Sequence, residues 1–293
     1  MFKRIILATD LSPVWDEIIS CAGEFKALGG TDIILTHVIT VRFLSGMEGA
    51  LQAEAREKLA AQKAQLEAQG FAVGIEIPIG LPAHSLNEVA QCCGADLIVL
   101  GSHGKATWRE AVLGSVSSAA LHHIEYPTLL LNVQLKEGLP AGSCRLQTTA
   151  MLRHILYPTD FSAISERAGD YLTGLAPLGV SQVTVLHALD LPPSEVNPPG
   201  YQESLATQAQ DALQAVTRRL QAAGIPSVTP VFDPGHPLPA IMRLLTAADI
   251  SLIVMGTQGK GFLREIFLGG VAHNVTRLAP CPVLLIPPAT REA

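Results

Sequence analysis

The sequence predicts an α/β protein with two tandem, doubly wound parallel sheets, each of five strands in the order 3-2-1-4-5. Three observations lead to this prediction. Short, nearly continuous apolar runs alternate with longer stretches of helical composition, which is typical of a parallel sheet covered on both faces. The whole pattern then occurs a second time in the same chain. In both copies, a glycine-rich segment follows the fourth apolar run.

The two halves of the chain align residue for residue near their beginnings. Residues Ile6–Ser12 match Leu156–Ser162, and His37 matches His187. Repeats of this length are duplicated domains and not solenoid units. The segment between the copies is rich in Gly, Pro, Ser and Thr, as a linker is. The expected boundaries are residues 1–135 for the first domain, 136–151 for the linker and 152–293 for the second domain.

Within each copy the strands and helices follow one another in the order βαβαβαβαβ. The strands are expected at the apolar runs, and the longest helices should end where a glycine follows them, at Gly70 and Gly224. A shorter helix should precede the fourth strand of each copy. The expected strands of the first copy include Ile5–Leu7, Ile33–Leu35, Leu97–Leu100 and Leu129–Leu131, and the expected helices are Glu48–Gln69, Asn87–Cys93, Tyr201–Ala223 and Leu238–Ala247.

Composition restricts the classes of function. The chain has 293 residues and a formal net charge of −6, with no run of Lys or Arg. A large nucleic-acid footprint or a polybasic membrane patch is therefore not expected. No apolar run is long enough to span a membrane, so we expect a cytoplasmic protein. Five cysteines without paired spacing favour free thiols over a disulfide framework or a zinc site; a redox role is the alternative.

The strand order predicts where a ligand binds. In an open α/β sheet, ligands bind beyond the carboxyl ends of the strands, at the point where the strand order reverses. Here that point lies between the first and fourth strands. Thr9 and Asp10 end the first strand, Gly101 ends the fourth, and Val38 follows the second. An aspartate can accept hydrogen bonds from ribose hydroxyl groups, and backbone groups near Val38 can meet a base edge.

The glycine-rich segment predicts a phosphate-binding loop. Gly101, Gly104 and Gly114 are separated by two and nine residues, and Gly256, Gly259 and Gly269 repeat this spacing. Without a Cβ, the backbone can approach phosphate oxygens closely, and the N-terminus of the following helix attracts an anion. For each copy taken alone, the alternative is an ordinary βα turn. Two other nucleotide-binding motifs are absent. A Walker A loop needs Ser or Thr after its lysine, and neither lysine 105 nor lysine 260 is followed by one. A dinucleotide-binding fold needs G-x-G-x-x-G after the first strand, and no such segment occurs.

These residues resemble the universal stress protein family in its tandem two-domain form. Its nucleotide-binding members carry G-x2-G-x9-G-[S/T] after the fourth strand and an aspartate in the first βα turn. Gly101, Gly104, Gly114 and Ser115 match that motif in full, and Asp10 matches the aspartate. The resemblance covers nearly the whole chain. It implies a fold like that of the adenine nucleotide alpha hydrolases, with the two domains related by a pseudo-twofold axis.

The resemblance also implies that the protein binds ATP, ADP or AMP. Mg²⁺ could accompany a triphosphate, held mostly by phosphate oxygens and water, with Asp10 as a candidate ligand. In the second copy, Gly270 stands where the family has Ser or Thr, so the phosphate-binding hydroxyl is lost and the first site is expected to be stronger. The expected nucleotide-binding residues are Ala8, Thr9, Asp10, Val38, Gly101, His103, Gly104, Gly114, Ser115, Val116 and Ser117 in the first copy, and Pro158, Thr159, Asp160, Ala188, Gly256, Gln258, Gly259, Gly269, Gly270 and Val271 in the second.

Several alternatives stay open at this stage. Ser115 is equally well explained as a helix N-cap, and the lysines at 105 and 260 as solvated surface residues. His37 and His187 are best explained as buried histidines with satisfied hydrogen bonds. No nucleophile–base pair is evident, so the protein is expected to be at most a weak ATPase.

Three functions are compatible with these residues. The first is a stress-response sensor or regulator that acts through nucleotide-dependent assembly or partner binding. The second is a protein-interaction scaffold that binds no nucleotide, and the third is a slow ATP hydrolase. The family implies pairing of the fifth strands, which here would form a pseudo-dimer within one chain. A homodimer and unidentified protein partners are further expectations. Binding to nucleic acid or to a membrane is not expected.

Overall fold

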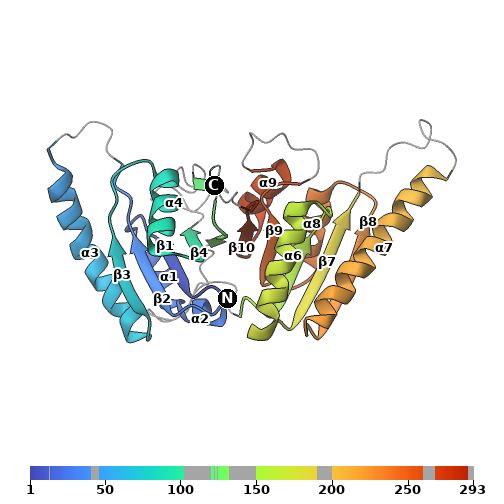
Figure 1. The fold of residues 1–293 in the computed structure, drawn as a ribbon, viewed down its shortest axis with the longest axis horizontal. Helices are drawn as coiled ribbons and strands as arrows, with labels where there is room; N and C mark the ends of the chain where they lie inside the picture. The colour runs from blue at the N-terminus through green and yellow to red at the C-terminus, as the bar shows by residue number, and fades with distance from the viewer. Residues whose placement is uncertain are drawn as a thin grey trace. The chain divides into compact units, whose positions relative to one another are not determined.

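The computed structural model of the chain describes residues 1–12, 14–40, 46–101, 120–121, 123, 125–131, 150–189, 200–259 and 268–289. Two compact units are present. Met1–Ala150 forms most of the first, and Met151–Val275 forms most of the second. Each unit is a parallel sheet with helices on both faces (Figure 1).

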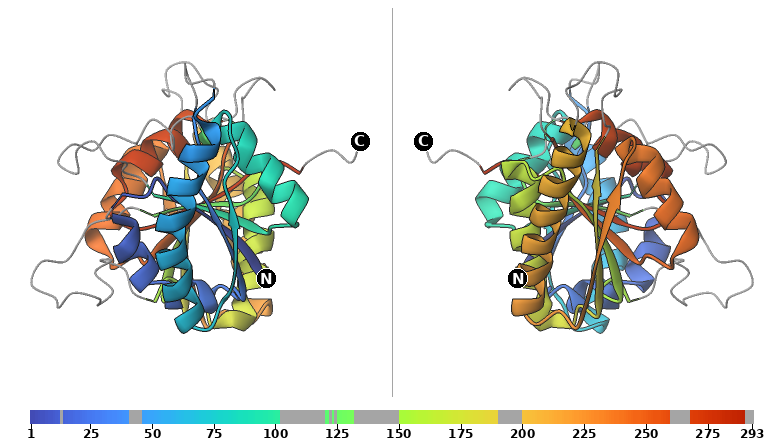
Figure 2. Two further views of the ribbon diagram at one scale, coloured as in Figure 1. Left: turned by 90° about the vertical axis from the view of Figure 1, so that its left-hand side faces the viewer. Right: turned by 90° about the vertical axis from the view of Figure 1, so that its right-hand side faces the viewer.

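The first unit contains five parallel strands in the order β3-β2-β1-β4-β5. Strands β4 and β5 are buried along their full length, as their continuous apolar sequences predict. Helix α3 packs on β3, as the left-hand view of Figure 2 shows. The elements are β1 (Arg4–Ala8), α1 (Val14–Ser20), α2 (Gly23–Ala27), β2 (Asp32–Thr36), α3 (Glu48–Ala68), β3 (Ala72–Glu76), α4 (Pro82–Cys93), β4 (Leu97–Gly101) and β5 (Thr128–Leu131).

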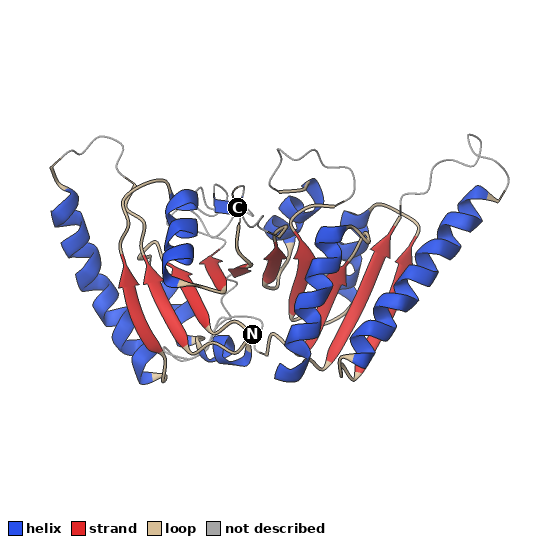
Figure 3. Ribbon diagram, viewed as in Figure 1, coloured by secondary structure: helices blue, strands red, loops and turns tan. Residues whose placement is uncertain are grey.

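The second unit repeats this arrangement with strands in the order β8-β7-β6-β9-β10. Helix α7 packs on β7 and β8, and α6 packs on β9 (Figures 2 and 3). The predicted order 3-2-1-4-5 is thus confirmed in both units. The elements are β6 (His154–Pro158), α6 (Ala163–Leu175), the 3₁₀-helix η1 (Ala176–Leu178), β7 (Gln182–Ala188), α7 (Tyr201–Ala222), β8 (Ser227–Asp233), α8 (Pro237–Ala247), β9 (Leu252–Gly256), α9 (Gly270–Leu278) and β10 (Val283–Ile286).

Most predicted helices are present within one residue of their expected ends. Helix α4 begins five residues earlier than expected, because Pro82 occupies its first turn, where a missing N–H has no cost. The helical region after β1 is divided into two short helices, α1 and α2, whereas its counterpart α6 is continuous. The helix expected after the first glycine-rich segment, and most of the linker, lie outside the described residues.

The cysteines differ in part from the expectation. Cys92, Cys93 and Cys281 are free thiols, as predicted. Cys21 is disulfide-bonded, so the prediction of free thiols is wrong for that residue. Spacing along the sequence could not reveal this bond, because it depends on which thiols tertiary folding brings together. Among the described helices, none combines the length and the apolar character that crossing a membrane requires.

Candidate functional site

The predicted ligand-binding position lies where β6 and β9 run side by side in the second unit. The two strands pair in parallel, with Ile155 opposite Leu252 and Leu156 opposite Ile253. The chain leaves β6 toward β7 and returns to the opposite side through β9, so the strand order reverses between them. This is the position at which open α/β sheets bind ligands.

A cavity of about 170 Å³ lies at this position. It is lined by the ends of β6, β7 and β9, by α8, and by the segment that begins α9. Every residue predicted for the second copy lines it: Pro158, Thr159, Asp160, Ala188, Gly256, Gln258, Gly259, Gly269, Gly270 and Val271. The structure thus brings together residues from Pro158 to Val271 that lie in separate segments of the sequence.

Several lining residues were not predicted. Pro237 and Ile241 come from α8, while Leu186 and Met255 come from β7 and β9. Together with Pro158 they form apolar walls, which suit the faces of an aromatic ring. Their signal in the sequence is weak, because an apolar residue on a helix beside a sheet is also an ordinary core residue. Ser165 and Thr257 complete the unpredicted polar lining.

The turn after β6 is held by its own side chains. Thr159 Oγ1 accepts a hydrogen bond from the Phe161 N–H at 3.1 Å, and Asp160 Oδ1 accepts one from the Ser162 N–H at 3.0 Å. Phe161 has a φ of 58°, in the left-handed region that non-glycine residues rarely adopt. Such local strain is often found at functional sites. The aspartate is therefore presented in a defined position at the cavity.

The first unit builds the same turn after β1. The N–H groups of Leu11 and Ser12 donate to Thr9 Oγ1 and Asp10 Oδ1, each at 3.0 Å. Leu11 has a φ of 60°. The turn is therefore a shared feature of both copies, down to its strained residue.

A histidine supports each of these turns. His187 Nδ1 donates to the Thr159 carbonyl oxygen at 2.7 Å, and His37 Nδ1 donates to the Thr9 carbonyl oxygen at 2.8 Å. A carbonyl oxygen only accepts, so Nδ1 carries the proton in both rings. The His187 ring also lies 4.4 Å from the Phe161 ring. Both histidines thus have a hydrogen-bonded structural role, as the sequence suggested.

Close packing requires two of the glycines in the glycine-rich segment at the end of β9. A Cβ at Gly256 would lie 2.8 Å from Ile164 Cγ2 and 3.1 Å from the Ile164 carbonyl carbon. A Cβ at Gly259 would lie 2.4 Å from Asp160 Oδ2. The first glycine therefore lets α6 approach the end of β9, and the second lets the aspartate carboxylate lie against the loop.

The other end of the cavity is formed by the start of α9. This helix begins at Gly270, and the N–H groups in the first turn of a helix have no acceptor within the helix. A Cβ at Gly270 would meet nothing within 4 Å. Asp160 is the single ionisable side chain among the described residues that line the cavity. The arrangement combines apolar walls, one carboxylate and a helix N-terminus that can bind an anion.

The first unit is described only in part at the corresponding position. Ala8 and Gly101 end β1 and β4, with Ala8 opposite Leu100. Thr9 is buried and Asp10 half-buried, and Val38 follows β2. The remaining predicted residues lie outside the described part of the chain: His103, Gly104, Gly114, Ser115, Val116 and Ser117. No group of three or more potential metal-ligating side chains occurs in the described ranges.

Both units of the chain are similar in sequence to known proteins of one family. The model of the universal stress protein family matches residues 1–132 and 151–287. A universal stress protein of Methanocaldococcus jannaschii is 29% identical over 154 residues, which are 45% of this chain and 95% of that protein. A universal stress protein of Mycolicibacterium smegmatis is 25% identical over 303 residues, covering 97% of each chain.

The fold is shared with solved structures as well. The crystal structure of a universal stress protein from Archaeoglobus fulgidus aligns with a TM-score of 0.76 and 22% identity, covering 97% of this chain and 98% of that one. The match of the family model to both units, together with a relative that aligns over 97% of both chains, leads to one conclusion: the chain belongs to the universal stress protein family.

Proposed function

We propose that the cavity of the second unit binds an adenine nucleotide, and that the protein acts as a stress-response sensor or regulator through nucleotide-dependent assembly or partner binding. The observation that carries the proposal is the convergence of three chemically different walls on one cavity. These are an apolar wall, the Asp160 carboxylate, and the glycine loop with the start of α9.

Each wall suits one part of a nucleotide. Pro237 and Ile241 offer an apolar surface to the adenine ring, and Asp160 can accept hydrogen bonds from ribose hydroxyl groups. The N–H groups at the start of α9, beginning with Gly270, face the phosphates, where the helix dipole favours negative charge. Nothing in these walls distinguishes ATP from ADP or AMP. Mg²⁺ would be held mainly by phosphate oxygens and water.

The first unit is proposed to bind a nucleotide in the same way. Its aspartate turn has the same hydrogen bonds as that of the second unit. Its full motif, with Ser115, predicts tighter binding than in the second unit. Pairing of the fifth strands, a homodimer and further protein partners also remain part of this proposal.

A matched pair of variants tests nucleotide binding. We expect Asp160→Asn and Asp10→Asn each to weaken binding at one unit, seen in isothermal titration of the full chain with ATP, ADP and AMP. Loss of a charge-assisted hydrogen bond should weaken the affected site by about tenfold or more. Nucleotide retained by the purified protein, released on denaturation and identified by mass spectrometry, is the second readout.

The absence of any binding at millimolar nucleotide, with no retained nucleotide, would contradict the proposal and favour a scaffold that binds proteins alone. Release of phosphate over hours, abolished in the Asp10 or Asp160 variant, would add slow hydrolysis to the binding function.

A further inference from the structure

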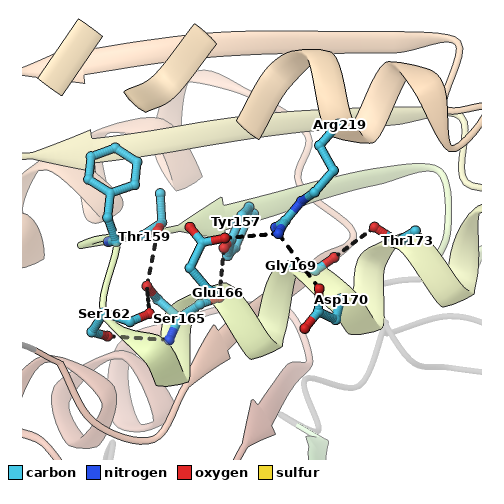
Figure 4. Close-up of polar contacts among 10 residues, drawn as sticks. Tyr157, Thr159, Ser162, Ser165, Glu166, Gly169, Asp170, Thr173 and Arg219 are labelled. Atoms are coloured by element: carbon cyan, nitrogen blue, oxygen red, sulfur yellow. Dashed lines mark hydrogen bonds and ion pairs between the residues drawn. The ribbon is translucent and has the colours of Figure 1, made fainter. Parts of the chain in front are cut away.

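Hydrogen bonds donated by hydroxyl groups link Tyr157 in the interior of the second unit, through the backbone of Ser165, to residues that line the cavity (Figure 4). Tyr157 Oη donates to the Ser165 carbonyl oxygen at 2.6 Å. Thr159 Oγ1 donates to Ser165 Oγ at 3.1 Å, and Ser165 Oγ donates in turn to the Ser162 carbonyl oxygen at 3.0 Å. These hydrogen bonds therefore connect β6, the turn after it and the first turn of α6.

Two members of this hydrogen-bonded set are also cavity residues. Thr159 and Ser165 both line the cavity and both are buried. Ser165 Oγ donates its one proton to the Ser162 carbonyl oxygen, so it accepts the proton of Thr159 Oγ1, which itself accepts the Phe161 N–H. Asp160 lies between Thr159 and Phe161 in the turn. Its orientation therefore depends on a turn that Ser165 ties to α6.

Tyr157, the interior member of this hydrogen-bonded set, is buried and closely surrounded by other side chains. Burial raises the pKa of Tyr157 to about 12, so its hydroxyl stays protonated and remains a donor near neutral pH. Arg219 on α7 lies against the same part of α6, with Nη1 at 2.9 Å from Glu166 Oε2 and 3.6 Å from Asp170 Oδ1. Figure 4 shows the side chains of Arg219 and Tyr157 beside Gly169, where a Cβ would lie 2.9 Å from Tyr157 Oη.

The first unit has no such set of hydrogen bonds. Leu7 occupies the position that matches Tyr157, and Trp15 the position that matches Ser165. Ser12, the counterpart of Ser162, has a buried Oγ with no hydrogen-bond partner among the described residues. The units share the two hydrogen bonds within the turn and the bond from the supporting histidine, but not the bonds of Tyr157 and Ser165. The hydrogen-bonded set is thus particular to the second unit.

We propose that Tyr157 and Ser165 are positioning residues that hold Thr159 and Asp160 in place for ribose, and so give this cavity its preference for ribonucleotides. This inference rests on the proposed nucleotide binding. Apart from Pro158, the apolar walls come from β7, α8 and β9, and the anion-binding end comes from the start of α9, so most contacts to the base and the phosphates do not depend on the turn. Loosening the turn should therefore weaken recognition of the ribose hydroxyl groups selectively.

The test compares AMP with dideoxy-AMP, which lacks both ribose hydroxyl groups. Isothermal titration would use the full chain carrying Asp10→Ala, so that the first unit offers no carboxylate to ribose. We expect the parent to prefer AMP by about tenfold, the size of one charge-assisted hydrogen bond. Tyr157→Phe and Ser165→Ala should reduce this preference to about twofold or less and leave the affinity for dideoxy-AMP unchanged.

Thr173→Ala is the matched control. Thr173 Oγ1 donates to the Gly169 carbonyl oxygen at 3.1 Å, so this variant also removes a hydroxyl bonded to the backbone of α6, but away from the cavity. It should keep the tenfold preference. Unchanged binding of dideoxy-AMP shows that each variant is folded, and a merely structural role would weaken both ligands equally.

Two outcomes would overturn the inference. If the parent binds AMP with a clear preference and both variants retain it, positioning by Tyr157 and Ser165 is wrong while nucleotide binding stands. If neither AMP nor dideoxy-AMP binds to the parent, the inference and the proposed function fail together.

Discussion

The Asp160 carboxylate lies directly against Gly259, although β6 and the loop after β9 are far apart in the sequence. A Cβ at position 259 would be 2.4 Å from Asp160 Oδ2, well inside van der Waals contact. The other carboxylate oxygen, Oδ1, is already bonded to the Ser162 N–H. The glycine of the loop and the aspartate of the turn are therefore parts of one arrangement.

Gly259→Ala should displace the aspartate without unfolding the protein. The added methyl group meets the end of a side chain, which can rotate, but rotation breaks the bond to Ser162 and moves the carboxylate from its place in the cavity. We expect nucleotide affinity at the second unit to fall by about tenfold or more, in line with the loss of a hydrogen bond to a charged group. Isothermal titration measures this, and Gly49→Ala in α3 of the first unit, where a Cβ meets nothing within 4 Å, is the control.

Gly270→Ser should strengthen nucleotide binding at the second unit. The position has room for a side chain, lines the cavity and begins α9, so a serine hydroxyl can reach an anion held at the helix N-terminus. One added hydrogen bond to a charged group predicts a gain of about tenfold. The comparison that matters is with Gly270→Ala, because equal affinities for the two variants would show that the hydroxyl contributes nothing.

Gly169→Ala should destabilise the second unit. A Cβ there would lie 2.0 Å from Arg219 Nη2 and 2.9 Å from Tyr157 Oη, and overpacking of this kind costs about 1–3 kcal/mol. Since alanine is the better helix former by about 1 kcal/mol, we expect a net loss of up to about 2 kcal/mol in urea unfolding.

Gly49→Ala in α3 provides the contrast for that experiment. Its Cβ would meet nothing within 4 Å, so helix propensity alone should apply, and stability should rise by up to about 1 kcal/mol. A similar gain for Gly169→Ala would mean that the contacts of Gly169 with Arg219 and Tyr157 do not constrain this position.

The stability of the second unit should depend on pH through His154. Burial lowers the pKa of this histidine below its usual 6.5, and the nearby Arg153 guanidinium lowers it further, while Asp249 acts in the opposite direction. The unfolded chain then binds a proton at a higher pH than the folded chain does. The stabilising contribution is present above pH 6.5 and is lost as the pH falls toward the lower folded pKa.

Urea midpoints measured across this pH range test the effect. His154→Gln should flatten the profile between pH 6.5 and the folded pKa. An identical slope in the parent and the His154 variant would assign the pH dependence to other groups.

The free cysteines should react at very different rates with an alkylating reagent. Cys92 is exposed, whereas Cys281 is buried, and burial raises the pKa of its thiol to about 12. The thiolate is the reactive form, so Cys281 should stay unmodified in the native protein and react only after unfolding. Mass spectrometry of peptides after timed alkylation gives both rates, and fast native labelling of Cys281 would show that this region opens.

Much of the fold could be predicted from the sequence, because its signals are local. The apolar runs that became β4 and β9 are buried along their full length, and Gly70 follows the C-cap residue of α3, one residue beyond the helix end. Less predictable was the division of the helical region after β1 into α1 and α2. The disulfide bond of Cys21 was also not foreseen, because it depends on the folded chain and not on local spacing.

The sequence by itself determined the duplicated α/β architecture, the strand order and the edge of the sheet where Asp160 and Gly259 meet. Spacing within a strand, turn or helix sets these features, and each copy repeats that spacing. Only the tertiary structure decided that Ile241 of α8 and Ser165 of α6 line the same cavity, and that Tyr157 supports the turn of Asp160. The physical reason is that such contacts depend on how elements distant in sequence pack against one another, and no local pattern records this.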